Sequence, residues 1–242
     1  MNMATNKKYI YVTGGKGGIG KSTFTLALVD YMAQQGKVLL IDADPVNADS
    51  SAAYKDDKEA NVSTLRAKVR AEDSSGQIDA SGLIETLNLA DSGQAEITIV
   101  DAPAGDSTLL ISAGSIITEA CKQVGIESVF VWLVDSTDRT PVNALHGAWD
   151  AIKDADKIII VKNYRKGTNF EFFDNSKTVA GINESANVQT IDLPKIASRL
   201  EEHMRIDRMT WHEIATQTPL GNRVEGERMR RAMHATLKEV GL

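Results

Sequence analysis

The sequence predicts a doubly wound α/β fold, with a mainly parallel sheet flanked by helices. Short apolar runs alternate along the chain with longer amphipathic stretches. The apolar runs are nearly continuous, which is typical of strands buried on both faces. The 242 residues are 42% hydrophobic and 25% charged, a composition that can bury a core and excludes a disordered or fibrous protein. We expect one domain over residues 1–242.

The strands and helices follow from these patterns in order. The strand candidates are Tyr9–Val12, Val38–Ile41, Ile97–Val100, Val129–Val134, Ile158–Val161 and Val188–Leu193. The helical patterns are Lys21–Gln35, Gly82–Ala90, Leu109–Val124, Asn143–Lys153, Met209–Thr216 and Glu225–Val240. The first of these helices meets Gly36, which favours a C-cap. Strands that alternate with helices in this way predict parallel crossover connections.

One polar insertion, residues 49–76, interrupts the alternation. It is rich in Ala, Ser and Asp, and its Lys55–Asp73 part carries five positive and five negative charges. The pattern predicts a solvated helix and loop. A surface for partners or for a neighbouring subunit is the alternative interpretation.

Composition also excludes several classes of protein. A single cysteine, Cys121, cannot form an internal disulfide or a multi-cysteine metal site, and we expect it to be a small buried hydrophobic residue. No apolar run approaches the roughly 18 residues of a transmembrane helix. The first residues lack the apolar core of a signal peptide, so we expect a cytoplasmic protein.

Residues 15–22 (GKGGIGKS) match the phosphate-binding pattern G-x-x-x-x-G-K-[ST], between a predicted strand and a predicted helix. Glycines let backbone N–H groups approach phosphate oxygens, and the helix N-terminus adds its positive dipole end. Lys21 is expected at the β- and γ-phosphates, Ser22 at Mg²⁺ and Thr23 at the α-phosphate. The expected phosphate-binding residues are Gly15, Gly17, Gly18, Ile19, Gly20, Lys21, Ser22 and Thr23.

The string KGGIGKS, which begins at Lys16, resembles the deviant Walker A motif of the MinD/ParA family of P-loop ATPases. The resemblance implies the P-loop NTPase fold and an ATP-dependent homodimer. In that family the early lysine reaches the nucleotide of the partner subunit, so Lys16 is implied to be catalytic together with Lys21. A cation supplied in this way neutralises charge on the transferring phosphoryl group.

Two further motifs extend the resemblance. Residues 42–45 (DADP) are similar to the family's switch I, which implies that Asp42 lies near Mg²⁺ and that Asp44 orients or deprotonates the attacking water. Residues 101–105 (DAPAG) resemble switch II, which implies that Asp101 holds Mg²⁺ through water. Each motif follows a predicted strand, at the sheet edge where ligands bind in such folds. Each carboxylate alone could instead serve a turn or cap a helix.

The nucleotide base is expected to be adenine. A guanine-specific N-K-x-D motif is absent. The resemblance implies that Asn163, after a predicted strand, contacts adenine, although Asn163 could equally be a turn residue. Leu193-Pro194 is similar to a family segment in which the proline packs on the base, so Pro194 is a second candidate. The implied ligands are therefore ATP and Mg²⁺.

The distribution of charge indicates whether an ATP-bound dimer would bind DNA or a membrane. The net charge is −6, but residues 195–242 carry +2, and Lys162, Arg165 and Lys166 form a second basic cluster. Non-specific DNA binding of the ParA kind is therefore one hypothesis. A MinD-like membrane contact is another, because Met229, Ala232, Met233, Leu237 and Val240 form an apolar stripe among basic residues. A last helix packed in the core would show the same stripe.

The loop at residues 162–178, with Phe170, Phe172 and Phe173, resembles the StbB/TraL group of plasmid stability and conjugal-transfer ATPases. Those phenylalanines could also simply cap the core. The resemblance implies a Mg²⁺-dependent ATPase switch in partitioning, positioning or conjugal transfer, with an activating partner protein. The alternatives are a MinD-like membrane-associated ATPase and a small-molecule ATP-dependent ligase or kinase, against which Lys16 argues.

Overall fold

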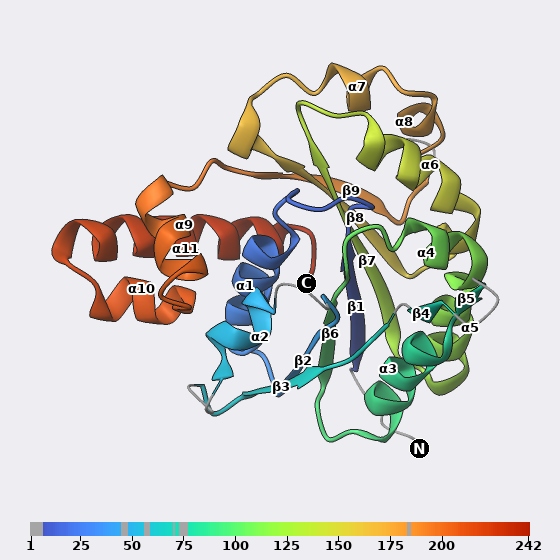
Figure 1. Cartoon of the computed structure of the whole chain (residues 1–242), viewed down its shortest axis with the longest axis horizontal. Coiled ribbons are helices and arrows are strands. Elements are labelled where there is room, and N and C mark those ends of the chain that lie inside the picture. Colours follow the sequence, from blue (N-terminus) through green and yellow to red (C-terminus); the bar gives the residue numbers. More distant parts are fainter. Residues whose placement is uncertain (1–6, 45–47, 56–58, 70, 73–76, 183–184) are drawn as a thin grey trace.

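A parallel sheet with helices on both faces forms the protein, as the sequence predicts (Figure 1). The computed structural model describes residues 7–44, 48–55, 59–69, 71–72, 77–182 and 185–242. In these residues the main sheet has seven strands in the order β3-β2-β6-β1-β7-β8-β9, and every pair is parallel. The strands are β1 (Lys8–Thr13), β2 (Val38–Asp42), β3 (Val62–Arg66), β6 (Ile97–Asp101), β7 (Glu127–Asp135), β8 (Lys157–Asn163) and β9 (Val188–Leu193).

The helices divide between two apolar layers, one on each face of the sheet (Figure 1). One layer contains α1 (Lys21–Met32), α2 (Asp49–Ala53), α9 (Ser198–Arg205), α10 (Trp211–Gln217) and α11 (Leu220–Glu239). The other contains α3 (Ser81–Ser92), α4 (Ser107–Ala113), α5 (Ser115–Val124), α6 (Thr140–Ile152), α7 (Glu171–Asp174) and α8 (Lys177–Ile182). Alternate strand residues enter each layer: Ile10 and Val12 of β1 pack on one side, and Tyr9 and Tyr11 on the other. Burial on both faces explains why the five inner strands read as nearly continuous apolar runs.

The polar insertion is more structured than the sequence predicts. Val62–Arg66 is the edge strand β3, paired in parallel with β2, where we expected only a helix and a loop. Within β3 Val62 is the buried residue, so its polar sequence resembles a loop. Two short antiparallel strands follow, β4 (Ala71–Glu72) and β5 (Ile78–Asp79). Residues 56–58, 70 and 73–76 of the insertion lie outside the described residues.

The predicted helix at residues 109–124 is two helices in the structure, α4 and α5, which meet at Gly114. A Cβ atom on Gly114 would lie 2.5 Å from the carbonyl oxygen of Leu110 and 3.2 Å from Ala151 of α6. Glycine therefore allows the chain to bend where α4 and α6 pack closely. Cys121 in α5 is 1% exposed, as expected for a small buried hydrophobic residue.

The apolar stripe of the C-terminal helix packs into the core. Met229, Met233, Leu237 and Val240 are all buried, whereas Ala232 is exposed. This is the core-packed alternative that the sequence left open. No helix within the described ranges has both the length and the apolar character needed to cross a membrane.

A buried ion cluster fastens α11 to α1. Asp30 of α1 is 2% exposed and accepts hydrogen bonds from Nε of Arg230 at 2.7 Å and Nε2 of His234 at 2.6 Å. Burial raises the pKa of Asp30, but the hydrogen bonds from His234 and Arg230 outweigh it and hold the pKa below the ordinary value of 3.8. Since α1 begins at the candidate phosphate loop, this cluster links that loop to the C-terminal helix.

We expect Asp30→Asn to lower the free energy of unfolding by about 2–4 kcal/mol, because Arg230 loses the charge that compensates it and His234 loses its carboxylate acceptor. Denaturant titration at neutral pH would measure the loss. The contribution should be present above about pH 4 and disappear as the pH falls through the lowered pKa of Asp30. Asp150→Asn is the matched control, since Asp150 pairs with Lys153 at 2.8 Å but is 90% exposed. A denaturation midpoint of Asp30→Asn equal to that of the wild type would contradict a stabilising role for this cluster between α1 and α11.

Candidate functional site

The candidate phosphate loop lies at the carboxyl edge of the sheet. It follows β1, which stands between β6 and β7, and it leads directly into α1. The chain crosses from β1 to β2 on one side and later to β7 on the other, so β1 marks the point where the strand order reverses. In such sheets the crevice at this point is the usual place for a ligand.

Three glycines give the loop its shape. Gly15, Gly18 and Gly20 have φ angles of 65°, 68° and 96°, which side chains of L-residues rarely allow. Gly20 is doubly constrained, because a Cβ atom there would collide with Nδ2 of Asn163. That Asn163 amide donates to the carbonyl oxygen of Ile19 at 2.7 Å. Asn163, at the end of β8, therefore contacts the loop at Ile19 and Gly20 and stabilises its conformation.

A cavity of about 860 Å³ opens beside the loop. The loop residues that line it are Gly17, Gly18, Gly20, Lys21, Ser22 and Thr23. Asp44, Asp49, Arg165 and residues of α9 also line this cavity. The cavity size suits a nucleotide-sized ligand.

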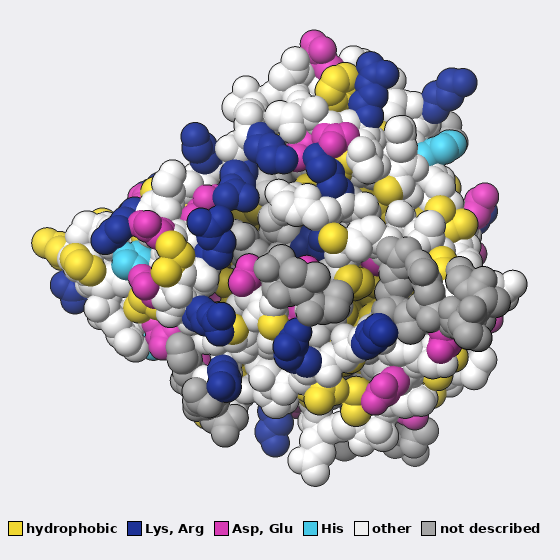
Figure 2. Space-filling model, viewed as in Figure 1, with side chains coloured by type: hydrophobic (Ala, Val, Ile, Leu, Met, Phe, Trp, Pro, Cys, Tyr) yellow, Lys and Arg dark blue, Asp and Glu magenta, His cyan; other side chains and the backbone are white. Residues whose placement is uncertain are grey.

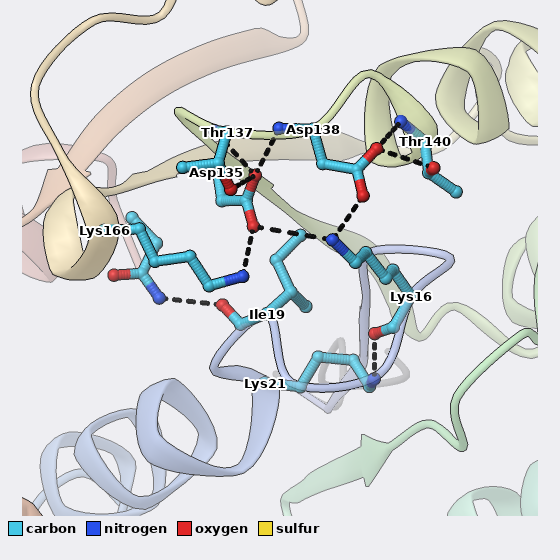
Figure 3. Close-up of polar contacts among 9 residues, drawn as sticks. Lys16, Ile19, Lys21, Asp135, Thr137, Asp138, Thr140 and Lys166 are labelled. Carbon is cyan, nitrogen blue, oxygen red and sulfur yellow. Dashed lines mark hydrogen bonds and ion pairs between the residues drawn. The ribbon is translucent and has the colours of Figure 1, made fainter.

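The two lysines of the loop point in different directions (Figure 3). Lys21 is 7% exposed, and its ammonium folds back over the loop to donate to the carbonyl oxygen of Lys16 at 3.0 Å. Lys16 extends the opposite way, toward the turn after β7 (Figure 3). Lys21 is thus positioned within the phosphate cavity, whereas Lys16 is held away from it.

Two carboxylates hold the Lys16 ammonium in its own chain. Lys16 donates to Asp138 and lies 3.9 Å from Asp135 (Figure 3). Lys166 shares Asp135, with its Nζ at 2.9 Å. The hydrogen bond from Lys16 holds the pKa of Asp138 well below its ordinary value, helped by hydrogen bonds from Thr140. Sequence reasoning missed Asp135 and Asp138, although two acidic residues at and just after the end of β7 could have indicated them.

The expected metal-binding carboxylates lie side by side in the sheet. Asp42 of β2 and Asp101 of β6 are register partners, and both are 1% exposed. Asp42 accepts hydrogen bonds from Ser50 and from the backbone of Ser51, each at 2.9 Å. Asp101 has neither oxygen in a hydrogen bond of ordinary geometry with the described residues, although the hydroxyls of Ser50 and Ser22 lie near it. Burial, and then the neighbouring Asp42, raise the pKa of Asp101 to about 6.

This arrangement fits Mg²⁺ held together with phosphates. No group of three or more His, Cys, Asp or Glu that could hold a metal occurs among the residues that the structure describes. Mg²⁺ commonly uses only one or two protein ligands and completes its shell with water and phosphate oxygens. The carboxylate of Asp101, which accepts no hydrogen bond of ordinary geometry from the described residues, and the Ser22 hydroxyl supply oxygen ligands of that kind.

Asp44 lies on the cavity wall, two residues after Asp42, where its backbone N–H donates to Oδ1 of Asp42 at 3.2 Å. Arg66 of β3 contacts the Asp44 carbonyl oxygen at 3.4 Å. Pro45, the last residue of the switch I motif, lies outside the described residues. The structure therefore brings Asp44 to the same cavity as Lys21 and Ser22.

Asp106 is a buried carboxylate that sequence reasoning missed. It directly follows the switch II motif, just before α4, and is 0% exposed. Oγ1 of Thr13 donates to it, at 2.8 and 2.7 Å from its two oxygens. Burial raises its pKa to about 6 although this hydrogen bond opposes the rise. The contact ties the start of α4 to the end of β1.

The two residues expected at the base lie apart from the phosphate cavity. Asn163 is 4% exposed; besides its bond to Ile19, its Oδ1 accepts the backbone N–H of Arg165 at 3.0 Å. Pro194 lines a second cavity of about 490 Å³ together with Tyr164, Arg165 and Asp192. The turn alternative for Asn163 is therefore visible in the structure, and its contact with adenine stays a prediction.

The basic cluster at and just after the end of β8 is largely neutralised. Lys162 pairs with Asp174 at 2.6 Å, Arg165 pairs with Glu201 and Lys166 pairs with Asp135. Figure 2 shows one face of the molecule, on which Asp and Glu side chains lie among the Lys and Arg side chains. The cluster therefore adds less positive potential for DNA than its sequence suggests.

A family model for the CobQ/CobB/MinD/ParA nucleotide-binding domain matches residues 10–240, nearly the whole chain. The chain belongs to this family. This confirms the resemblance seen in the loop and switch motifs, and it establishes a nucleotide-binding domain of the MinD/ParA type. The match includes the phosphate loop, both switch motifs, and the helical segment from α9 to α11.

Individual relatives agree with the family. The chain is 30% identical over 237 residues to Protein MobD of Acidithiobacillus ferrooxidans. The alignment covers 96% of this chain and 98% of MobD. Among solved structures it resembles the MinD cell division protein of Aquifex aeolicus, with a TM-score of 0.53, 20% identity, and coverage of 93% and 96% of the two chains. It also resembles apo McdA of Cyanthece, with a TM-score of 0.51, 15% identity, and coverage of 97% and 99%. At these identities the solved structures support the fold alone.

Proposed function

We propose that the protein is a Mg²⁺-dependent ATPase switch. ATP binds in the loop cavity, two ATP-bound chains pair face to face, and hydrolysis separates them. The observation that carries the proposal is the opposed placement of the two loop lysines, with Lys21 folded over the loop and Lys16 turned away from it. A lysine in this position is suited to the phosphates of a second chain rather than to those of its own.

The roles of the cavity residues follow from their chemistry. Loop N–H groups and Lys21 would bind phosphates, and Mg²⁺ held by Ser22 and Asp101 would neutralise phosphate charge. Asp42 would position the metal shell, and Asp44 would orient or deprotonate the attacking water. Lys16 of the second chain would stabilise the charge that develops on the transferring phosphoryl group.

The proposed biological role is partitioning, positioning or conjugal transfer, with an activating partner protein. Membership of the StbB/TraL group is part of this proposal. In the loop that carries this resemblance, Phe170 and Phe173 are buried, and Phe172 is 39% exposed with the Arg139 guanidinium over its ring. Burial of the Met229–Val240 stripe removes the apolar surface on which a MinD-like membrane contact was based.

Asp44→Ala tests the proposed cycle. We expect the rate of ATP hydrolysis to fall by about 100-fold or more, because the attacking water loses the carboxylate that orients or deprotonates it. ATP should still bind and the dimer should persist. Gel filtration with ATP and Mg²⁺, together with phosphate release, would measure both. Asp49→Ala is the matched control, since Asp49 lines the same cavity from α2. A wild-type chain that stays monomeric with ATP would instead favour a small-molecule ligase or kinase.

A further inference from the structure

Arg165 stands at the boundary between two cavities. It belongs to η2 (Tyr164–Lys166), the short helix directly after β8. It lines the phosphate cavity together with the loop glycines, and it also lines the second cavity beside Pro194. A nucleotide whose phosphates occupy the loop and whose base extends toward β8 and β9 therefore meets this side chain in either cavity.

The guanidinium of Arg165 is held by its edge. Its Nε lies 2.9 Å from Oε1 of Glu201, and its Nη2 lies 3.1 Å from Oε2, so the pair is a two-point fork between η2 and α9. A fork of this kind fixes the guanidinium plane and leaves its flat faces available for stacking. Because Glu201 compensates the charge, the group is better suited to a flat neutral ring than to phosphate.

A chain of contacts fixes Arg165 relative to the phosphate loop. Asn163 donates to the Ile19 carbonyl of the loop at 2.7 Å and accepts the Arg165 backbone N–H at 3.0 Å. Both ends of the Asn163 amide therefore bind the protein itself, within a side chain that is 4% exposed. The side chain of Arg165, in contrast, is 42% exposed and reaches the cavity wall.

We propose that Arg165, held by Glu201, is the residue on which the nucleotide base stacks. The inference rests on the proposed binding of ATP in the loop cavity and assigns the base contact to Arg165 rather than to Asn163. Planar bases stack on guanidinium groups through their π-faces, and purines offer the larger face. Glu201 acts as a positioning residue that sets the orientation of this plane.

The test compares ATP with inorganic tripolyphosphate, which has the phosphates but no base. Binding of each to the full chain is measured by calorimetry with Mg²⁺. We expect Arg165→Ala to weaken ATP about tenfold, the usual loss for one stacked base, and to change tripolyphosphate by less than about twofold. Arg165→Lys should lose as much ATP affinity as Arg165→Ala, because lysine keeps the charge but not the plane.

Glu201→Gln provides the second measurement and should weaken ATP by a smaller factor without weakening tripolyphosphate. Arg228→Ala is the matched control, because Arg228 of α11 makes a similar fork with Glu225, at 2.7 Å for both contacts, and is not among the described residues that line the two cavities. Equal losses for both ligands, no loss for either, or full rescue by Arg165→Lys would overturn the base contact. A wild-type chain that binds neither ligand would instead overturn the proposed function.

Discussion

Lys16→Ala should leave ATP binding nearly intact while abolishing the ATP-dependent dimer and lowering hydrolysis by about 1,000-fold or more, the usual contribution of a cation supplied by a second chain. The reason is geometric: the Lys16 side chain points away from its own phosphate cavity, toward Asp135 and Asp138. Its removal therefore takes nothing from nucleotide binding within the chain. Gel filtration with ATP and Mg²⁺, nucleotide titration and phosphate release measure the three quantities separately.

Two further variants make this result interpretable. Lys21→Ala should lose nucleotide binding itself, because Lys21 lies in the cavity wall. Asp138→Asn removes the partner that holds Lys16 in its own chain and should allow the dimer to form at equal or lower ATP concentration. If Lys16→Ala pairs and hydrolyses ATP as the wild type does, the switch proposal is wrong.

Asp101→Asn is expected to stabilise the nucleotide-free chain by about 1–3 kcal/mol. The change removes a carboxylate whose charged form is disfavoured by burial and by Asp42, and which accepts no hydrogen bond of ordinary geometry from the described residues. The same change should abolish Mg²⁺-dependent tightening of ATP binding, since an amide is a much poorer ligand for Mg²⁺ than a carboxylate. Thermal unfolding without nucleotide, and ATP titration with and without Mg²⁺, would record the two opposite effects.

Asp42→Asn is the informative comparison for Asp101→Asn. Asp42 occupies the neighbouring position in the sheet and is equally buried, but it accepts hydrogen bonds from Ser50 and Ser51. We therefore expect Asp42→Asn to destabilise the chain, opposite in sign to Asp101→Asn. A lower melting temperature for both variants would show that Asp101 is satisfied in the folded chain and that its charge serves structure.

Hydrophobic periodicity was sufficient for six of the seven strands of the main sheet. Five of the six are buried on both faces, and the sixth, the edge strand β9, buries only Ile191 and Leu193 but keeps a recognisable apolar pattern. The seventh, β3, escaped prediction because an edge strand with one buried residue, Val62, carries a polar sequence. The break at Gly114 escaped as well, since its cause is the approach of Ala151 from α6, a contact between segments far apart in the chain.

In the candidate site, too, the sequence motifs predict some residues and miss others. The glycine loop and Asp44 line one cavity, and Asp42 and Asp101 end two neighbouring strands of the sheet, as the motifs and their places in the sequence predict. The contacts of Asn163, Asp106 and Arg165 could not be predicted, because each depends on side chains from separate strands or helices meeting at one edge of the sheet. The spacing of residues along the chain contains no information on such tertiary contacts.

The contacts of Lys16 within its own chain give the proposed cycle an energetic threshold. Lys16 and Lys166 balance Asp135 and Asp138, so the four groups together are electrically neutral. If Lys16 leaves for a second chain, it exposes a net negative charge that must be compensated elsewhere. Pairing would then be unfavourable until two bound triphosphates repay this cost together, which would keep the resting population of dimers low and make the transition steep in ATP concentration.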